Sequence, residues 1–129
     1  MKMNDKKLEA AFRSFPWVAA AFMLGSAARG CQRADSDVDV AVLPGPDDKP
    51  TVLERVELAV QLEGILHRDI DLGILSTDNL VYAKEAYLTG RCIYSRNEFH
   101  RDLFGATALG LYAGLRQERR EIEDAYRID

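Results

Sequence analysis

The stretch that decides the fold is Leu24-Gly25-Ser26, ten further residues, and then Asp37-Val38-Asp39-Val40-Ala41-Val42-Leu43. The eight residues from Trp17 to Leu24 are the longest uninterrupted apolar run of the chain. A membrane span needs about twenty apolar residues, so this run predicts a buried strand. Residues 37–43 predict a second strand, which Pro44 ends. The small residues after Leu24 predict a tight turn that opens a helical turn.

Helical and extended patterns alternate through the rest of the chain. Apolar residues at helical spacing predict four helices, Lys2–Phe15, Thr51–Leu66, Asn79–Thr89 and Ser95–Tyr126. Alternating or short apolar runs predict two more strands, Arg68–Leu75 and Cys92–Tyr94. This mixture of strands and helices predicts the α/β or α+β class with a small sheet.

Two of the expected helices begin with the capping-box pattern, Thr51 with Glu54 and Ser95 with Glu98. The first of the two has apolar positions at helical spacing: Val52, Val56, Ala59, Leu62 and Leu66. The last helix of the chain has its own stripe: Phe104, Ala108, Leu111, Leu115, Ile122 and Tyr126. We expect the long last helix to offer a docking surface.

Composition limits the classes of function that fit. The 129 residues, 47% hydrophobic, predict one domain over residues 1–129. The 17 basic and 21 acidic residues give a net charge of −4, which argues against direct nucleic-acid binding through a basic stripe. Neither a membrane span nor a signal segment is expected. Cys31 and Cys92 fit neither a zinc spacing nor a disulfide framework, so we expect a reduced, cytoplasmic setting.

The chemistry of the decisive stretch begins with its two aspartates. Side chains at positions i and i+2 of a strand point to the same face, about 6.6 Å apart along the chain. Asp37 and Asp39 therefore present two carboxylates together, and their mutual repulsion favours a cation between them. Oxygen ligands without a neighbouring His or Cys suit Mg²⁺, which commonly takes substrate phosphates as further ligands.

Gly25 and Ser26 supply the complementary half of the predicted site. A glycine lets a ligand approach the backbone, and N–H groups at a helix start favour phosphate. A two-metal site needs a third acid on a neighbouring strand, and Asp71 is our candidate as ligand or base. Asp69 lies nearer the end of that strand. The predicted chemistry is transfer of a nucleoside monophosphate, with pyrophosphate as leaving group.

The same residues are compatible with other patterns, which fit less well. The aspartates alone could be a solvated strand end. They also begin like an EF-hand loop, but Val40 stands at its sixth position and Pro46 at its twelfth. A phosphate-binding P-loop fails because Cys31-Gln32 occupy the places of Lys and Ser or Thr. Arg29 and Arg33 are either phosphate contacts or solvated loop residues.

The spacing Gly25-Ser26-x10-Asp37-x-Asp39 resembles the signature of the DNA polymerase β-like nucleotidyltransferases. The short chain, with Asp69-Ile70-Asp71-Leu72 at the place of the third acid, is similar to the minimal nucleotidyltransferases. Residues 112–120 resemble the C-terminal helix of the MntA-type antitoxins of HEPN/MNT toxin–antitoxin modules. The resemblance implies a small mixed sheet flanked by helices, with a long C-terminal helix.

The resemblance also implies an activity. Such antitoxins silence a HEPN-domain ribonuclease by transferring AMP from ATP to a tyrosine of that toxin. Gly25, Ser26 and Arg29 would then bind the nucleotide, while Asp37, Asp39 and Asp71 would hold two Mg²⁺ ions and perform catalysis. Two alternatives stay open: transfer to a small molecule such as an aminoglycoside, and a toxin-binding module without catalysis. The acceptor residue, the number of AMP units, the nucleotide preference and the stoichiometry do not follow from the sequence.

Overall fold

A four-stranded mixed sheet forms the centre of the protein in a computed structural model that describes residues 2–25 and 37–127. The strands are β1 (Val18–Met23), β2 (Val38–Pro44), β3 (Ile70–Ile74) and β4 (Arg91–Ser95). Their order across the sheet is β3-β2-β1-β4. β1 pairs antiparallel with both β2 and β4, whereas β2 and β3 run parallel. The expected small mixed sheet is therefore confirmed.

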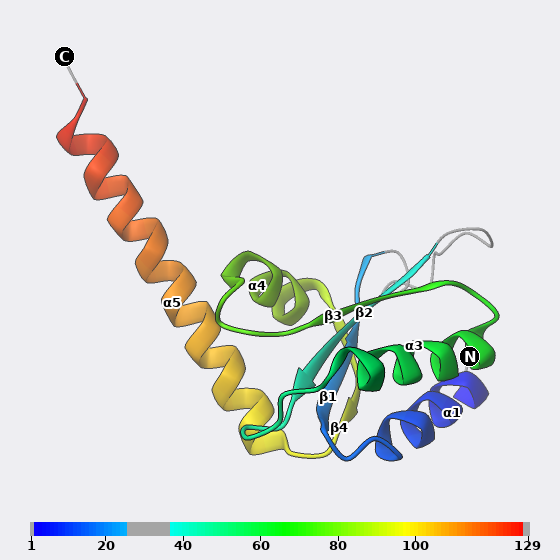
Figure 1. Ribbon diagram of the computed structural model, residues 1–129. Helices are drawn as coiled ribbons and strands as arrows, with labels where there is room; N and C mark the ends of the chain where they lie inside the picture. The colour runs from blue at the N-terminus through cyan, green and yellow to red at the C-terminus, as the bar shows by residue number, and fades with distance from the viewer. Residues whose placement is uncertain (1, 26–36, 128–129) are drawn as a thin grey trace.

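Helices cover both faces of this sheet (Figure 1). On one side lie α1 (Lys2–Arg13) and α3 (Val52–Leu66), and on the other lie α4 (Leu80–Thr89) and α5 (Glu98–Ala125). α3 connects β2 to β3, because parallel neighbours need a crossover connection. The 28-residue α5 extends well beyond the sheet (Figure 1), which confirms the long C-terminal helix.

Each face of the sheet has its own hydrophobic core. β1 is buried along its whole length, as its apolar run predicts. A register shift between Val18 and Ala20 places Val18, Ala21 and Met23 in the core beneath α1 and α3. Ala20 and Phe22 belong to the opposite core, beneath α4 and α5. A strand buried on both faces explains why the run lacks polar alternation.

The stripe expected on α3 is only partly correct. Thr51 does form the predicted capping box with Glu54. However, the residues that α3 buries are Leu58 and Leu62, while Val52 and Val56 are exposed. The helix contains apolar residues on more than one face, so periodicity alone could not select the buried one.

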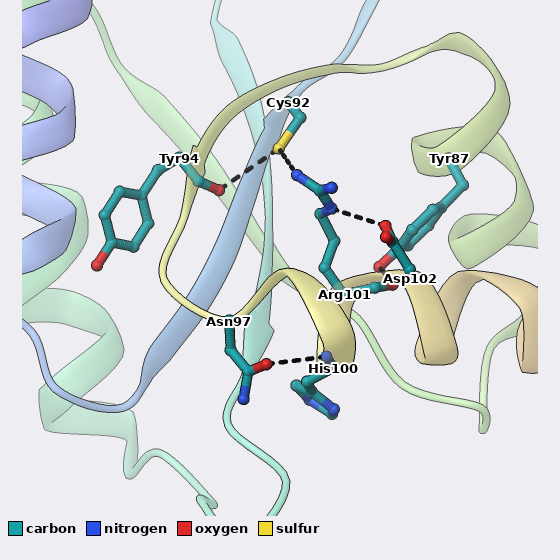
Figure 2. Close-up of polar contacts among 7 residues, drawn as sticks. All are labelled: Tyr87, Cys92, Tyr94, Asn97, His100, Arg101 and Asp102. Atoms are coloured by element: carbon teal, nitrogen blue, oxygen red, sulfur yellow. Dashed lines mark hydrogen bonds and ion pairs between the residues drawn. The ribbon is translucent and has the colours of Figure 1, made fainter.

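The capping box expected at Ser95 is wrong. Asn97 is the N-cap of α5, and its side chain accepts a hydrogen bond of 3.0 Å from the His100 N–H (Figure 2). Ser95 is instead the last residue of β4. Its hydroxyl is buried and has no hydrogen-bond partner in the described structure. Because β4 extends to Ser95, this residue is part of a strand and cannot be the N-cap of α5.

The start of α5 is fixed to its neighbours by polar contacts (Figure 2). The Tyr87 hydroxyl of α4 donates a hydrogen bond of 2.8 Å to the Arg101 carbonyl, and the Arg101 guanidinium donates one of 3.8 Å to Cys92 Sγ of β4. Further along, Ala108 is buried, but the stripe from Leu111 onwards is exposed. Among the described helices, none is long and apolar enough to cross a membrane.

We expect Asn97→Ala to destabilise the protein by about 1 kcal/mol, because α5 loses its N-cap. Ser95→Ala is the matched control and should be neutral or slightly stabilising, since the Ser95 hydroxyl has no partner to lose. Chemical denaturation of the two variants measures both effects. A larger loss for Ser95→Ala than for Asn97→Ala would contradict this assignment of the cap.

Candidate active site

Parallel pairing of β2 with β3 brings two acidic side chains together. The register places Asp39 opposite Asp71, and Val38 opposite Ile70. The Val38 N–H donates a hydrogen bond of 2.9 Å to the Asp69 carbonyl, which fixes this register where β2 begins. Val38 and Val40 beside Asp39 belong to the core beneath α1 and α3, and Ile70 and Leu72 beside Asp71 pack against the same core. Both carboxylates therefore point to the other face of the sheet.

Gly25 lies beside this pair, directly after β1. The Leu24 N–H donates a hydrogen bond of 3.0 Å to the Asp39 carbonyl, so the end of β1 is joined to the strand that carries the acid. Gly25 has φ +63°, a left-handed conformation that favours glycine. A Cβ at this position would lie 3.6 Å from Asp39 Oδ2. The backbone of Gly25 is therefore an open surface next to a carboxylate.

A pocket of about 430 Å³ connects these features. Its walls are Leu24 and Gly25 after β1, together with parts of β2, β3 and α4. Its polar lining includes Asp39, Asp71, Asn79, Tyr82 and Glu85. A hollow of about 480 Å³ also exists at the opposite end of β2 and β3, near Pro44 and Leu75. We place the functional site in the first pocket because the acid pair lies there.

The electrostatics of the pocket are those of crowded negative charge. Burial, the charge of the neighbouring Asp71 and the hydrogen bond between the two carboxyl groups raise the pKa of Asp39. Asp37 and Glu85 contribute smaller effects in the same direction. Burial, followed by the charges of Asp71, Asp39 and Glu85, raises the pKa of Tyr82 to about 12. A cation in the pocket would relieve this repulsion.

The residues present fit a magnesium ion that shares its ligands with a substrate. Within residues 2–25 and 37–127, no three His, Cys, Asp or Glu side chains converge as a complete metal-binding group. The structure thus brings together Asp39 and Asp71, but it does not add Asp37 to a three-carboxylate cluster. Mg²⁺ is often held by one or two carboxylates together with substrate phosphates, and two carboxylates are available here.

The other candidate residues have different positions. Asp37 is exposed, one residue before β2, and its charge still acts on Asp39. Asp69 is exposed at the start of β3. Ser26 and Arg29, the remaining candidates for nucleotide binding, lie outside the described residues.

Sequence reasoning missed three residues of the pocket, Asn79, Tyr82 and Glu85. They belong to α4 or its N-cap, which faces the acid pair across the pocket. Their spacing of three residues puts them on one side of the helix. That spacing was visible in the sequence, but nothing there indicated that this side of α4 meets β3.

A family model matches the part of the chain that builds this site. Residues 6–99, more than half of the chain, match the family described as polymerase beta, nucleotidyltransferase. The match includes Gly25, Asp37, Asp39 and Asp71, as well as the side of α4 that lines the pocket.

Individual relatives are similar over nearly the whole chain. The protein adenylyltransferase MntA of Shewanella oneidensis is 28% identical over 124 residues, which are 95% of this chain and 87% of the relative. A crystal structure of a toxin–antitoxin with AMP-PNP contains a chain that is 28% identical, with a TM-score of 0.77 and coverage of 95% and 97%. The structure of a tri-AMPylated Shewanella oneidensis HEPN toxin in complex with MNT antitoxin matches at 26% identity and a TM-score of 0.72, covering 96% of both chains.

The raised pKa of Asp39 predicts a dependence of stability on pH. Above the ordinary carboxyl pKa of 3.8 and up to the raised value, the folded protein binds more protons than the unfolded chain. The free energy of unfolding therefore falls as the pH rises through this window. Asp39→Asn removes the effect, so the variant should be more stable than the wild type at neutral pH, without ligands.

Denaturation across a pH series measures this difference, with the exposed loop acid Asp47→Asn as control. The advantage of Asp39→Asn should vanish below about pH 3.8, where both states of the wild type hold the proton. An advantage of equal size at every pH would show that the cause is not the ionised carboxylate.

Proposed function

Because the chain belongs to the polymerase β family of nucleotidyltransferases, we propose that it transfers AMP from ATP to a tyrosine of a HEPN ribonuclease toxin and thereby acts as its antitoxin. The observation that carries this proposal is the in-register pair Asp39 and Asp71, with Gly25 in the same pocket. The similarity to a protein adenylyltransferase, and to antitoxin chains solved with AMP-PNP or with an AMPylated toxin, supports the nucleotide and the partner.

Each residue has a role in this proposal. Gly25 offers its backbone to the triphosphate, and Ser26 and Arg29 add contacts from the segment that follows. Asp39 and Asp71 would hold Mg²⁺ from β2 and β3, and Asp37, one residue before β2, would join them in holding the second of two ions. When bound, Mg²⁺ neutralises charge on the triphosphate and makes the acceptor hydroxyl more acidic. Asp71 also positions the incoming tyrosine hydroxyl.

The transfer itself is a displacement at the α-phosphorus of ATP. The tyrosine hydroxyl gives its proton to Asp71 as general base, and its oxygen forms the new bond to the α-phosphorus. The bond from the α-phosphorus to the bridging oxygen breaks, so pyrophosphate leaves. Most of the catalytic effect comes from positioning and from stabilisation of negative charge, as in other phosphoryl transfers. The carboxylates would meet these requirements through the Mg²⁺ that they hold, and the open backbone at Gly25 lies beside them to receive the triphosphate.

Some properties stay predictions. The cytoplasmic location and the organisation of residues 1–129 as one domain rest on composition and length. Transfer to a small molecule, and binding of the toxin without catalysis, are the rival functions that an experiment must separate.

The double variant Asp37→Ala with Asp39→Ala should abolish incorporation of labelled AMP into the toxin, because metal and triphosphate lose their ligands. Association with the toxin should persist, because we expect the docking surface on α5, where Leu111, Leu115 and Ile122 are exposed. Labelled ATP and a pull-down with the purified pair measure the two properties. Asp47→Ala with Asp78→Ala, two exposed acids, is the matched control and should retain both.

The same variants distinguish the rival functions in cells. A double variant that protects cells from the toxin as well as the wild type does would show that occlusion, not catalysis, neutralises the toxin. A wild-type protein that transfers AMP to an aminoglycoside but never to the toxin would establish the small-molecule alternative.

A further inference from the structure

α4 forms a polar wall of the pocket that the proposed function leaves without a role. Asn79, Tyr82 and Glu85 line the pocket that also contains Gly25 and the acid pair. Asn79 is the N-cap of α4, and its side-chain oxygen accepts a hydrogen bond of 3.2 Å from the Tyr82 N–H. The amide N–H₂ group of Asn79 is thus the end of this side chain that is left to donate.

Tyr82 is fitted closely to the strand that carries Asp71. Its hydroxyl lies over Gly73, at the place where any other residue would have its Cβ. Gly73 is two residues after Asp71, so it belongs to the same face of β3. A glycine inside a strand weakens it, and close approach of another group is a usual reason for its presence. Here the group is the Tyr82 hydroxyl, which Gly73 admits into the pocket.

The hydrogen-bonding capacity of this wall is unused. In the described part of the chain, the Tyr82 hydroxyl makes no hydrogen bond and the Glu85 carboxylate makes no ion pair. The wall therefore offers one hydroxyl, one amide donor and one carboxylate acceptor at spacings of a single helical turn. Without a cation beside it, Glu85 would repel phosphate, so the wall suits an uncharged polar ligand.

A vicinal diol fits these groups. Each sugar hydroxyl both donates and accepts a hydrogen bond, so it can satisfy a carboxylate and a neutral donor at the same time. The position of these α4 side chains in the pocket also fits a sugar. With the triphosphate toward Gly25 and the α-phosphate at the acid pair, we place the sugar of the nucleotide toward α4, which lines the same pocket.

We propose that Tyr82 and Glu85 form a ribose-binding subsite that selects ribonucleotides over 2′-deoxyribonucleotides, with Asn79 as a supporting donor. The proposal rests on the proposed function, because it assigns part of the same pocket to the nucleotide. It adds a basis for choosing among nucleotides, which the acid pair alone does not provide. A site that hydrogen-bonds a substrate hydroxyl discriminates strongly against an analogue that lacks it.

The test compares AMP-PNP with its 2′-deoxy analogue by isothermal titration calorimetry in the presence of Mg²⁺. The wild type should bind AMP-PNP about ten- to a hundredfold more tightly, the effect of one hydrogen bond to a charged group. Glu85→Gln and Tyr82→Phe should each reduce this preference about tenfold or remove it, and should affect the deoxy analogue little. Tyr112→Phe is the matched control on α5 and should keep the wild-type preference.

Circular dichroism of each variant shows whether it is folded, and the comparison within the wild type needs no substitution. Equal affinity of the wild type for the two nucleotides would overturn the proposal, as would an unchanged preference in both α4 variants. AMP transfer with ATP and 2′-deoxy-ATP gives a second readout, in which the ratio of kcat/KM should follow the binding preference. A protein that prefers AMP-PNP but transfers AMP to no toxin would contradict the proposed function and leave the ribose subsite standing.

Discussion

The register between β2 and β3 is the constraint on which the site depends. Parallel pairing sets Asp39 opposite Asp71, and one residue of slippage would turn one of the two carboxylates into the core. The buried valines on the other face of β2 hold this register through hydrophobic packing. The packing of this core thus offsets the repulsion between the two carboxylates. The remaining negative charge in the pocket favours binding of a cation, which can in turn bind phosphates.

Much of the fold and the centre of the site could be predicted from local patterns. The apolar run before Gly25 predicts β1. The alternation around Asp39 and Asp71 predicts two strands, each with one face toward the core and the other toward the site. Thr51 and Glu54 mark the start of α3 because both ends of that hydrogen-bonded box are close in the sequence. Each of these signals depends on residues a few positions apart, where spacing translates directly into geometry.

Features that depend on contacts between distant segments could not be predicted in this way. Ser95 belongs to β4 because β1 pairs with it, so the cap of α5 moves to Asn97. α3 buries Leu58 and Leu62, not Val52 and Val56, because the direction of the sheet decides which side faces inward. The contribution of Tyr82 and Glu85 to the pocket likewise follows from the packing of α4 against β3, which brings Tyr82 onto Gly73.

The central claim is that Asp39 and Asp71 form one site for a magnesium-bound nucleotide. Titration of AMP-PNP into the wild type, with Mg²⁺ and with EDTA, tests it most directly, with Asp71→Asn as the comparison. The account predicts binding that requires Mg²⁺ and that is lost or strongly weakened in Asp71→Asn, although the variant stays folded. Binding of equal strength without the metal, or in Asp71→Asn, would contradict it.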